Sequence, residues 1–311
     1  MRAALVSDEA RSDAAVRQDF PSSRVLIAAT VGYLVPGAPF DAVVHGVYKR
    51  ACNLLVGDSL VVLATCESPD GPASVRLGGK GAIDLRAWFR VGEAIRRESD
   101  RLASLLVRID LHHAKTWTPL RPAAHAAASS SLVNRILART RLASRRSDQA
   151  SVLHREGGVS CSRLERACRN CDLPAAACEV SRLIGWGEGL TPAGDDFLVG
   201  LLAALHALVG RDGERRAFLD DLAAIVARAA SRTTPLAAHY LRLASSRHFN
   251  ADVHDLRDAL LTDPDASPLQ HVLDAVLSRG ATSGADLLTG MLAGIDAWSD
   301  PSPASRPAIT R

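Results

Sequence analysis

Two acids stand side by side at the predicted start of a long apolar helix. Asp195 and Asp196 follow the string GWGEGLTPAG and precede FLVGLLAAL. A third acid, Asp286, follows GATSGA and precedes LLTGMLAGI. The segments that begin at Asp196 and Asp286 carry Asp, Leu, Gly, Leu and Ala at the same offsets. The sequence therefore repeats one arrangement: a flexible turn, a helix start, an acid in the first turn, and a glycine one turn later.

Each of these helix starts has the chemistry of a site for an anion or a polar ligand. Unpaired N–H groups at a helix start attract anions, and the helix dipole favours carboxylates in the first turn. We expect Thr191 to cap the first helix and Thr282 or Ser283 to cap the second. In SRTTPLAAHYL, the same role falls to Thr233 or Thr234.

The glycines of the repeat indicate that the two helices lie close together. Glycine costs about 1 kcal/mol relative to alanine inside a helix, so its repetition at Gly200 and Gly290 suggests that geometry is being enforced. With no side chain on the face that carries the acid, the helices can approach and bring Asp196 and Asp286 together. Acids in first turns and glycines in helices also serve capping and packing alone, but their repetition favours a functional site.

A second candidate surface lies in the N-terminal half. In VHGVYKRACNLL, alternation places His45 and Asn53 on one face of a strand pair, together with Lys49. Such a face could bind an anion or simply meet water, and the pattern alone favours water.

The composition limits the class of protein. The chain has 311 residues, of which 47% are apolar and 4% aromatic, with a net charge of +3. Its basic residues form no stripe interleaved with aromatics, which disfavours a nucleic-acid partner. The longest apolar stretch falls short of the roughly 20 residues that span a membrane, and the N-terminus has acids where a signal peptide has an apolar core. We expect a cytoplasmic protein with no membrane partner.

Four cysteines are clustered at Cys161, Cys168, Cys171 and Cys178. The inner two form a C-x2-C pair, which can be half of a zinc site. The outer spacings are not typical of zinc ligands, and the sequence between them has helical periodicity. We expect buried thiols that pack as small apolar side chains, and we assign no metal site.

The chain changes character once, and this change predicts an α+β fold with two domains. Short runs rich in β-branched residues, separated by Gly, Pro, Asp and Ser clusters, predict an N-terminal β-rich barrel or sandwich. Residues 87–103 fit either a helix or strands. Helical periodicity then predicts a C-terminal all-α domain, with segments near 131–145, 161–184, 192–209, 214–231, 235–246, 252–262, 268–278 and 284–298. The predicted boundaries are a disordered tail at 1–22, a β-rich domain at 23–118, a linker with a helix at 119–158, the helical domain at 159–298 and a tail at 299–311.

The sequence resembles a known family. GWGEGLTPAGDDFLVGLL, TTPLAAHYL and GATSGADLLTGMLAG resemble its three C-terminal signatures, and VVHGVYKRACNLL and RIDLHHAKTWTP resemble its N-terminal signatures. This is the family of the small (AllH-type) subunit of oxamate carbamoyltransferase, formerly a domain family of unknown function. The resemblance spans roughly residues 25–298. The sequence departs from it at Gly46, at Ala238–His239 and at Ala281–Thr282.

The resemblance implies a part in allantoin and purine breakdown, in the phosphorolysis of oxalurate to oxamate and carbamoyl phosphate or in a related carbamoyl transfer. It implies partners in the other subunits of a carbamoyltransferase complex, and as ligands a small ureide or carbamoyl substrate and phosphate. The acids would hold Mg²⁺, accept the amide N–H groups of a ureide, or contact Arg or Lys of a partner subunit; the last two are favoured. Two other functions stay open: a non-catalytic scaffold subunit and a Mg²⁺-dependent hydrolase.

The candidate site follows from these patterns. The candidate catalytic residues are Asp195, Asp196 and Asp286. The candidate substrate-binding residues are Gly187, Gly189, Thr191, Gly194, Thr233, Thr234, Thr282, Ser283, Gly284, His45 and Asn53.

Overall fold

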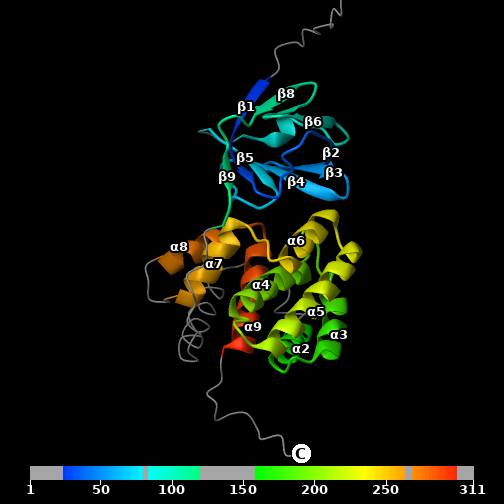
Figure 1. Cartoon of the computed structure of the whole chain (residues 1–311), viewed down its shortest axis with the longest axis vertical. Coiled ribbons are helices and arrows are strands. Elements are labelled where there is room, and N and C mark those ends of the chain that lie inside the picture. The colour runs from blue at the N-terminus through cyan, green and yellow to red at the C-terminus, as the bar shows by residue number, and fades with distance from the viewer. Residues whose placement is uncertain (1–23, 80–82, 120–157, 263–267, 300–311) are drawn as a thin grey trace, which may run out of the picture.

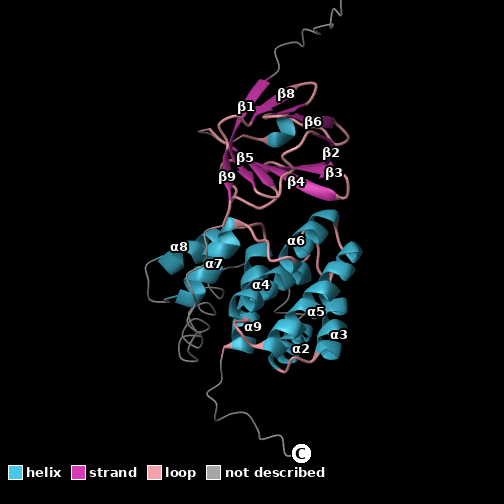
Figure 2. Cartoon of the chain, viewed as in Figure 1, coloured by secondary structure: helices cyan, strands magenta, loops and turns pink. Residues whose placement is uncertain are grey.

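The predicted fold class is confirmed by the computed structural model, which describes residues 24–79, 83–119, 158–262 and 268–299. Strands fill the N-terminal part of this range and helices the C-terminal part (Figure 1 and Figure 2). The predicted tail at 1–22, the helix near 131–145 and nearly all of the predicted tail at 299–311 lie outside the described residues.

The N-terminal domain is a barrel rather than a sandwich. Its strands are β1 (Arg24–Gly32), β2 (Phe40–Val47), β3 (Ala51–Val56), β4 (Ser59–Ala64), β5 (Ser74–Leu77), β6 (Ala94–Glu98), β7 (Arg101–Ala103), β8 (Val107–Asp110) and β9 (Lys115–Trp117). Their order in the sheet is β5-β4-β3-β2-β6-β7-β8-β1-β9, and β5 also pairs with β1. Eight strands therefore close on themselves, and β9 continues the pairing along the end of β1.

Local sequence explains how these strands are joined. Val56 pairs with Ser59, so β3 and β4 are joined by a two-residue turn in which Gly57 takes a φ of 56°. The segment 87–103, which fits either a helix or strands, contains the end of a short 3₁₀ helix, η1 (Leu85–Ala87), and the hairpin of β6 and β7. Alternating apolar side chains from the strands fill the barrel, with Leu54, Leu63 and Leu77 fully buried.

The C-terminal domain contains the helices α2 (Gly158–Arg169), α3 (Leu173–Leu183), α4 (Ala193–Leu208), α5 (Gly213–Ala229), α6 (Pro235–Ser245), α7 (Ala251–Thr262), α8 (Pro268–Leu277) and α9 (Ser283–Trp298), and the 3₁₀ turn η3 (Ala230–Arg232). The predicted helical segment at 161–184 is two helices. The break is at Cys171, with φ of 50°, and at Asp172, whose side chain caps α3 by accepting from the N–H of Ala175.

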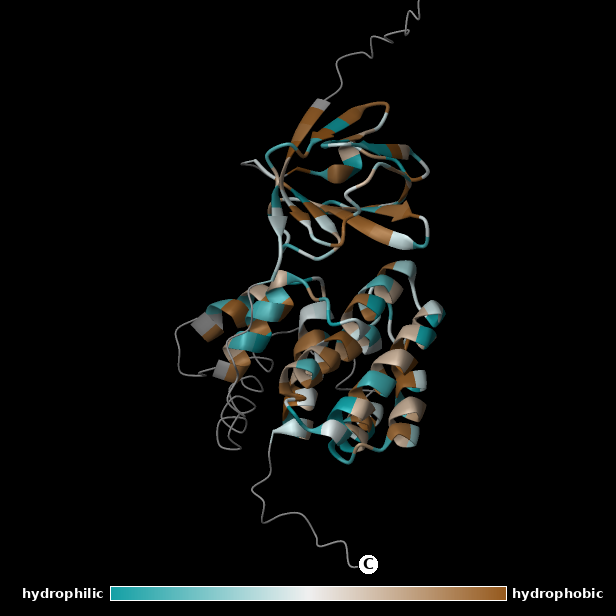
Figure 3. Ribbon diagram, in the orientation of Figure 1, coloured by the Kyte–Doolittle hydropathy of each residue, from teal (hydrophilic) through white to brown (hydrophobic). Residues whose placement is uncertain are grey.

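Helix α4 is the centre of the helical core. Every residue from Ala193 to Leu205 is buried, and in Figure 3 the helix is coloured hydrophobic along most of its length. Such an all-round apolar helix has to be enclosed by neighbours, and α9 lies along it. Helices α6 and α7 lie on the side of this domain that faces the barrel (Figure 1), where α6 contacts β4.

Candidate functional site

The two repeated helices cross at their glycines, as the sequence predicts. A Cβ on Gly200 would stand 2.0 Å from the carbonyl oxygen of Leu287, and a Cβ on Gly290 would stand 1.9 Å from that of Phe197. No side chain fits at either position, so backbone lies directly on backbone. The helices run side by side in the same direction, which brings Asp196 and Asp286 to one end of the pair.

The first glycine of each repeat serves a second close contact. A Cβ on Gly194 would stand 2.0 Å from the carbonyl oxygen of Leu183, at the end of α3. A Cβ on Gly284 would stand 1.9 Å from that of Val276, near the end of α8. Each of α4 and α9 is therefore packed tightly against the helix that precedes it, and the two hairpins α3–α4 and α8–α9 repeat the same contact.

Thr282 stands at the predicted capping position of α9, but the predicted side-chain caps of both helices are wrong. Pro192 occupies the capping position of α4, Thr282 occupies that of α9, and neither helix has a side-chain cap. The Thr191 and Ser283 hydroxyls instead hydrogen bond to each other at 2.8 Å. Local rules predicted two separate caps, but the close approach of the helices lets the hydroxyls join the two starts.

Asp195 holds three segments together. Its carboxylate accepts hydrogen bonds from the N–H of Gly185 at 3.0 Å and from the hydroxyl of Thr233 at 2.5 Å. The residue is 2% exposed. Burial raises its pKa, while the bonds from Thr233 and Gly185 act in the opposite direction. Both oxygens are thus engaged within the fold, one on the loop before α4 and the other next to α6.

The candidates Gly187, Gly189 and Thr234 help to fix the loop that precedes α4. Gly187 and Gly189 adopt φ values of 110° and 95°, which favour glycine, and a Cβ on Gly187 would stand 2.8 Å from the nitrogen of Ala193. Thr234 is the expected cap of α6: its hydroxyl accepts from the N–H of Ala237 and donates to the carbonyl of Leu190.

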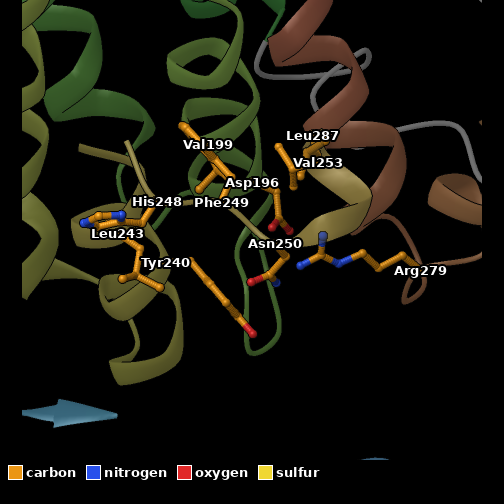
Figure 4. Close-up of a pocket in the computed structure, with 10 residues that line it drawn as sticks. All are labelled: Asp196, Val199, Tyr240, Leu243, His248, Phe249, Asn250, Val253, Arg279 and Leu287. Carbon is orange, nitrogen blue, oxygen red and sulfur yellow. The ribbon is translucent and has the colours of Figure 1, made fainter. Parts of the chain in front are cut away.

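Asp196 is the acid that lines a cavity. The cavity is small and partly open to solvent, and Figure 4 shows the Asp196 carboxylate pointing towards the polar side chains at its lower end. Its Oδ2 is buried with no hydrogen-bond partner among the described residues. Burial raises the pKa of Asp196 to about 7, against the opposing effects of the charge on Arg279 and of hydrogen bonds from Ser283 and Thr191; the charge on Asp286 raises it further.

Four other polar residues line the same cavity and are not among the residues predicted from the sequence. They are Tyr240, His248, Asn250 and Arg279. Arg279 lies just before the α9 turn, and its carbonyl accepts from the N–H of Gly284 at 3.2 Å. Its guanidinium pairs with Asp252 at 2.9 Å, and this charge raises its pKa. The sequence signal for Arg279 is a basic residue directly before the repeated turn, and that for Tyr240 is its place in the signature TTPLAAHYL. Asn250 had no such signal.

Asp286 is fully buried and does not line this cavity. The pKa of the Cys161 thiol is raised to about 12, mainly by burial. The negative charge on Asp286 is the next largest contribution, and that on Glu179 contributes less. Asp286 therefore lies towards α2. The two repeats present their acids to different surroundings, one cavity-lining and one enclosed.

The two candidates in the barrel do not reach the cavity. His45 is exposed, at an irregularity in the pairing of β2 with β3. Asn53 is 2% exposed, and its Oδ1 has no partner within the described residues. The strand pair does not give these two side chains a common environment.

The acids do not fit a magnesium site. Asp195 is bonded to Gly185 and Thr233, and Arg279 acts on Asp196 as its counter-charge. Across the described ranges, no group of three or more His, Cys, Asp or Glu side chains is placed to hold a metal ion. Cys161 and Cys168 are buried in the helical core and Cys178 is exposed. None of the described helices has the length and apolar character needed to cross a membrane.

Two family models match the chain. The model described as oxamate carbamoyltransferase subunit AllH matches residues 183–295, which include every polar residue of the cavity. The model described as the AllH family N-terminal domain matches residues 24–116, which make up nearly all of the barrel. No solved structure gives a significant match.

Proposed function

The chain belongs to the family of oxamate carbamoyltransferase subunit AllH, and on this premise we propose that it works in a carbamoyltransferase complex of ureide breakdown. The proposed reaction is the phosphorolysis of oxalurate to oxamate and carbamoyl phosphate. A phosphate oxygen forms a bond to the carbamoyl carbon, the bond from that carbon to the oxamate nitrogen breaks, and this nitrogen takes up a proton.

The cavity beside Asp196 is the proposed binding site for the ureide. Guanidinium groups bind carboxylates through charge-assisted hydrogen bonds, so Arg279 is suited to the carboxylate of oxalurate. Asn250 and Tyr240 project to the same end of the cavity (Figure 4) and supply amide and hydroxyl groups. Apolar side chains, among them Val199 and Leu287, form the opposite wall.

Asp196 is proposed to act on the amide groups of the substrate. Because burial raises its pKa to about 7, the carboxyl group is present in both protonation states near neutral pH. The ionised form accepts an N–H of the ureide, and the protonated form can give its proton to the nitrogen that leaves with oxamate.

One observation carries this proposal. Asp196 Oδ2 is buried and has no hydrogen-bond partner among the described residues, although a buried carboxylate normally has its oxygens bonded. A ligand N–H group in the adjoining cavity would satisfy it.

The test is the release of carbamoyl phosphate from oxalurate and phosphate, first with this chain alone and then with the proteins encoded next to it. We expect activity only in the mixture. In the assembled complex, Asp196→Asn and Arg279→Gln should each lower kcat/KM at least a hundredfold. The matched controls are Asp221→Asn and Arg96→Gln, which change exposed side chains. Full activity of both cavity variants, with assembly verified by gel filtration, would reject the proposed site.

A scaffold role is the second candidate, and the barrel surface favours it. Val25 and Ile27 on β1 are 58% and 59% exposed, and Leu105 and Leu106 in the adjoining β7–β8 turn are 70% and 62% exposed. Exposed apolar side chains that cluster in this way are typical of subunit contacts. If this is the chain's role, Val25→Ser with Ile27→Ser abolishes assembly, whereas the two cavity variants leave the activity of the complex intact.

A further inference from the structure

The α6–α7 loop, residues Ser246–Asn250, joins the cavity to the barrel. Three of the residues that line the cavity, His248, Phe249 and Asn250, belong to this loop. Arg247 adopts a φ of 66°, a left-handed conformation that is uncommon for a residue other than glycine. The backbone conformation of the loop is therefore not the one that its residues favour locally, and contacts with the rest of the protein must hold it.

Its first residues are held by α6. The N–H of His248 donates to the carbonyl of Leu243 at 2.8 Å, and that of Arg247 donates to the carbonyl of Ala244 at 3.0 Å. These bonds fix the backbone at the end of the helix. They do not fix the side chains of His248 and Asn250, which form the cavity.

The barrel holds those side chains. The hydroxyl of Tyr33, which directly follows β1, hydrogen bonds to Nδ1 of His248 at 2.8 Å. Tyr33 is itself held by stacking on Trp117 of β9, with ring centroids 6.2 Å apart. Burial raises the pKa of Tyr33 and lowers that of His248, so both groups are neutral near pH 7 and the bond forms without a charge on either.

Asn250 meets the barrel at a glycine. A Cβ on Gly71 would stand 2.5 Å from Oδ1 of Asn250, so any larger residue would force this amide group to move. The neighbouring backbone is fixed as well, because the N–H of Ala251 donates to the carbonyl of Asp70 at 2.8 Å. Asp70 is in turn held by Arg76 at 2.7 Å and by the hydroxyl of Thr30.

We infer that the barrel shapes the cavity of the helical domain, and that Tyr33 and Gly71 are positioning residues for His248 and Asn250. Neither Tyr33 nor Gly71 lines the cavity, so each acts through a residue that does. The inference rests on the proposed function only for the identity of the ligand.

Two variants test it in the full-length chain and in the assembled complex. Tyr33→Phe removes one hydroxyl and keeps the ring on Trp117, and Gly71→Ala pushes on Asn250. Tyr48→Phe, a change of the same kind elsewhere in the barrel, is the control. The first measurement is amide hydrogen exchange of residues 246–251 in the free chain. The second is KM and kcat for oxalurate in the complex.

We expect both variants, unlike the control, to speed exchange in 246–251 and to raise KM roughly fivefold, the effect of about one hydrogen bond, with kcat within about twofold. Unchanged exchange in both variants would overturn the inference. Faster exchange with an unchanged KM would also overturn it. A fall in kcat together with a fall in Tm would overturn it as well, because that pattern marks a merely structural role. If the wild-type complex does not turn over oxalurate, the proposed function fails, and the exchange data still decide whether the barrel holds the loop.

Discussion

Thr191 and Ser283 share a hydrogen bond of 2.8 Å although 92 residues separate them in the chain. Each hydroxyl stands at the start of one of the two repeated helices, where its ordinary role is to cap that helix. Their bond joins the starts of α4 and α9 close to Asp196, and the two hydroxyl groups act to lower the pKa of that acid. The starts of the two repeated helices therefore form a single polar cluster.

The glycine crossing predicts a large loss of stability on adding a methyl group. Gly200→Ala or Gly290→Ala places a Cβ within about 2 Å of a backbone oxygen, which can move only with its helix. We expect each variant to lose about 3 kcal/mol or more, the upper end for overpacked cores, in urea unfolding. Gly213→Ala, where nothing lies within 4 Å of the new Cβ, should unfold like the wild type. Equal midpoints for all three would contradict the tight crossing.

The raised pKa of Asp196 predicts how the stability of the folded protein depends on pH. Its folded pKa of about 7 lies above the unfolded value of about 3.9, so the folded state binds the proton more tightly. Its contribution is therefore most favourable below about pH 4 and declines as pH rises to about 7. Asp196→Asn removes this decline and should be more stable than the wild type at pH 8, by on the order of 2–4 kcal/mol.

The measurement is denaturant unfolding of both proteins at pH 4, 6 and 8. Asp221→Asn, at an exposed position of α5, shows what the loss of an ordinary surface charge does. A constant difference between Asp196→Asn and the wild type at all three pH values would show that burial does not perturb this carboxyl group.

The bond from Thr233 to Asp195 predicts that a single hydroxyl stabilises the contact between the start of α4 and the segment before α6. Thr233→Val leaves a buried carboxylate oxygen without its donor, which costs about 1–3 kcal/mol. Thr233→Ser keeps the hydroxyl and should restore most of that loss. Thermal unfolding of the three proteins distinguishes these effects, and a serine variant as unstable as the valine variant would point to lost packing instead.

The cysteines predict a clear order of chemical modification. Cys178 is exposed, whereas Cys161 and Cys168 are buried and burial raises the pKa of both thiols. Only thiolates react readily with iodoacetamide, so peptide mass spectrometry should find Cys178 labelled first and the other two labelled only in denaturant. Early labelling of Cys168 would contradict its place in the core.

The repeated helices could be predicted because their pattern is local. Each copy carries its turn, acid and glycine within about a dozen residues, and the two copies together predicted the close crossing at Gly200 and Gly290. The capping prediction failed for the same reason: it considered Thr191 and Ser283 separately, and the bond that they form exists only after the helices meet.

The cavity could not be predicted in full. Asp195 and Asp196 are adjacent in sequence but point about 100° apart around the helix, and no pattern reveals which one faces a cavity. Arg279, Asn250 and Tyr240 reach it from three separate segments that share no motif. Their meeting depends on how α6, α7 and α9 pack, which is decided by the fold as a whole.

The reciprocal glycine contacts also make the spacing of the two repeated helices independent of the surroundings of their acids. Because Gly200 and Gly290 each rest on the other helix's backbone, the spacing between the two main chains that carry the acids does not depend on an intervening side chain. The two acids can therefore have different surroundings, Asp196 beside a cavity and Asp286 fully buried, while the backbone contact keeps the two helices in register.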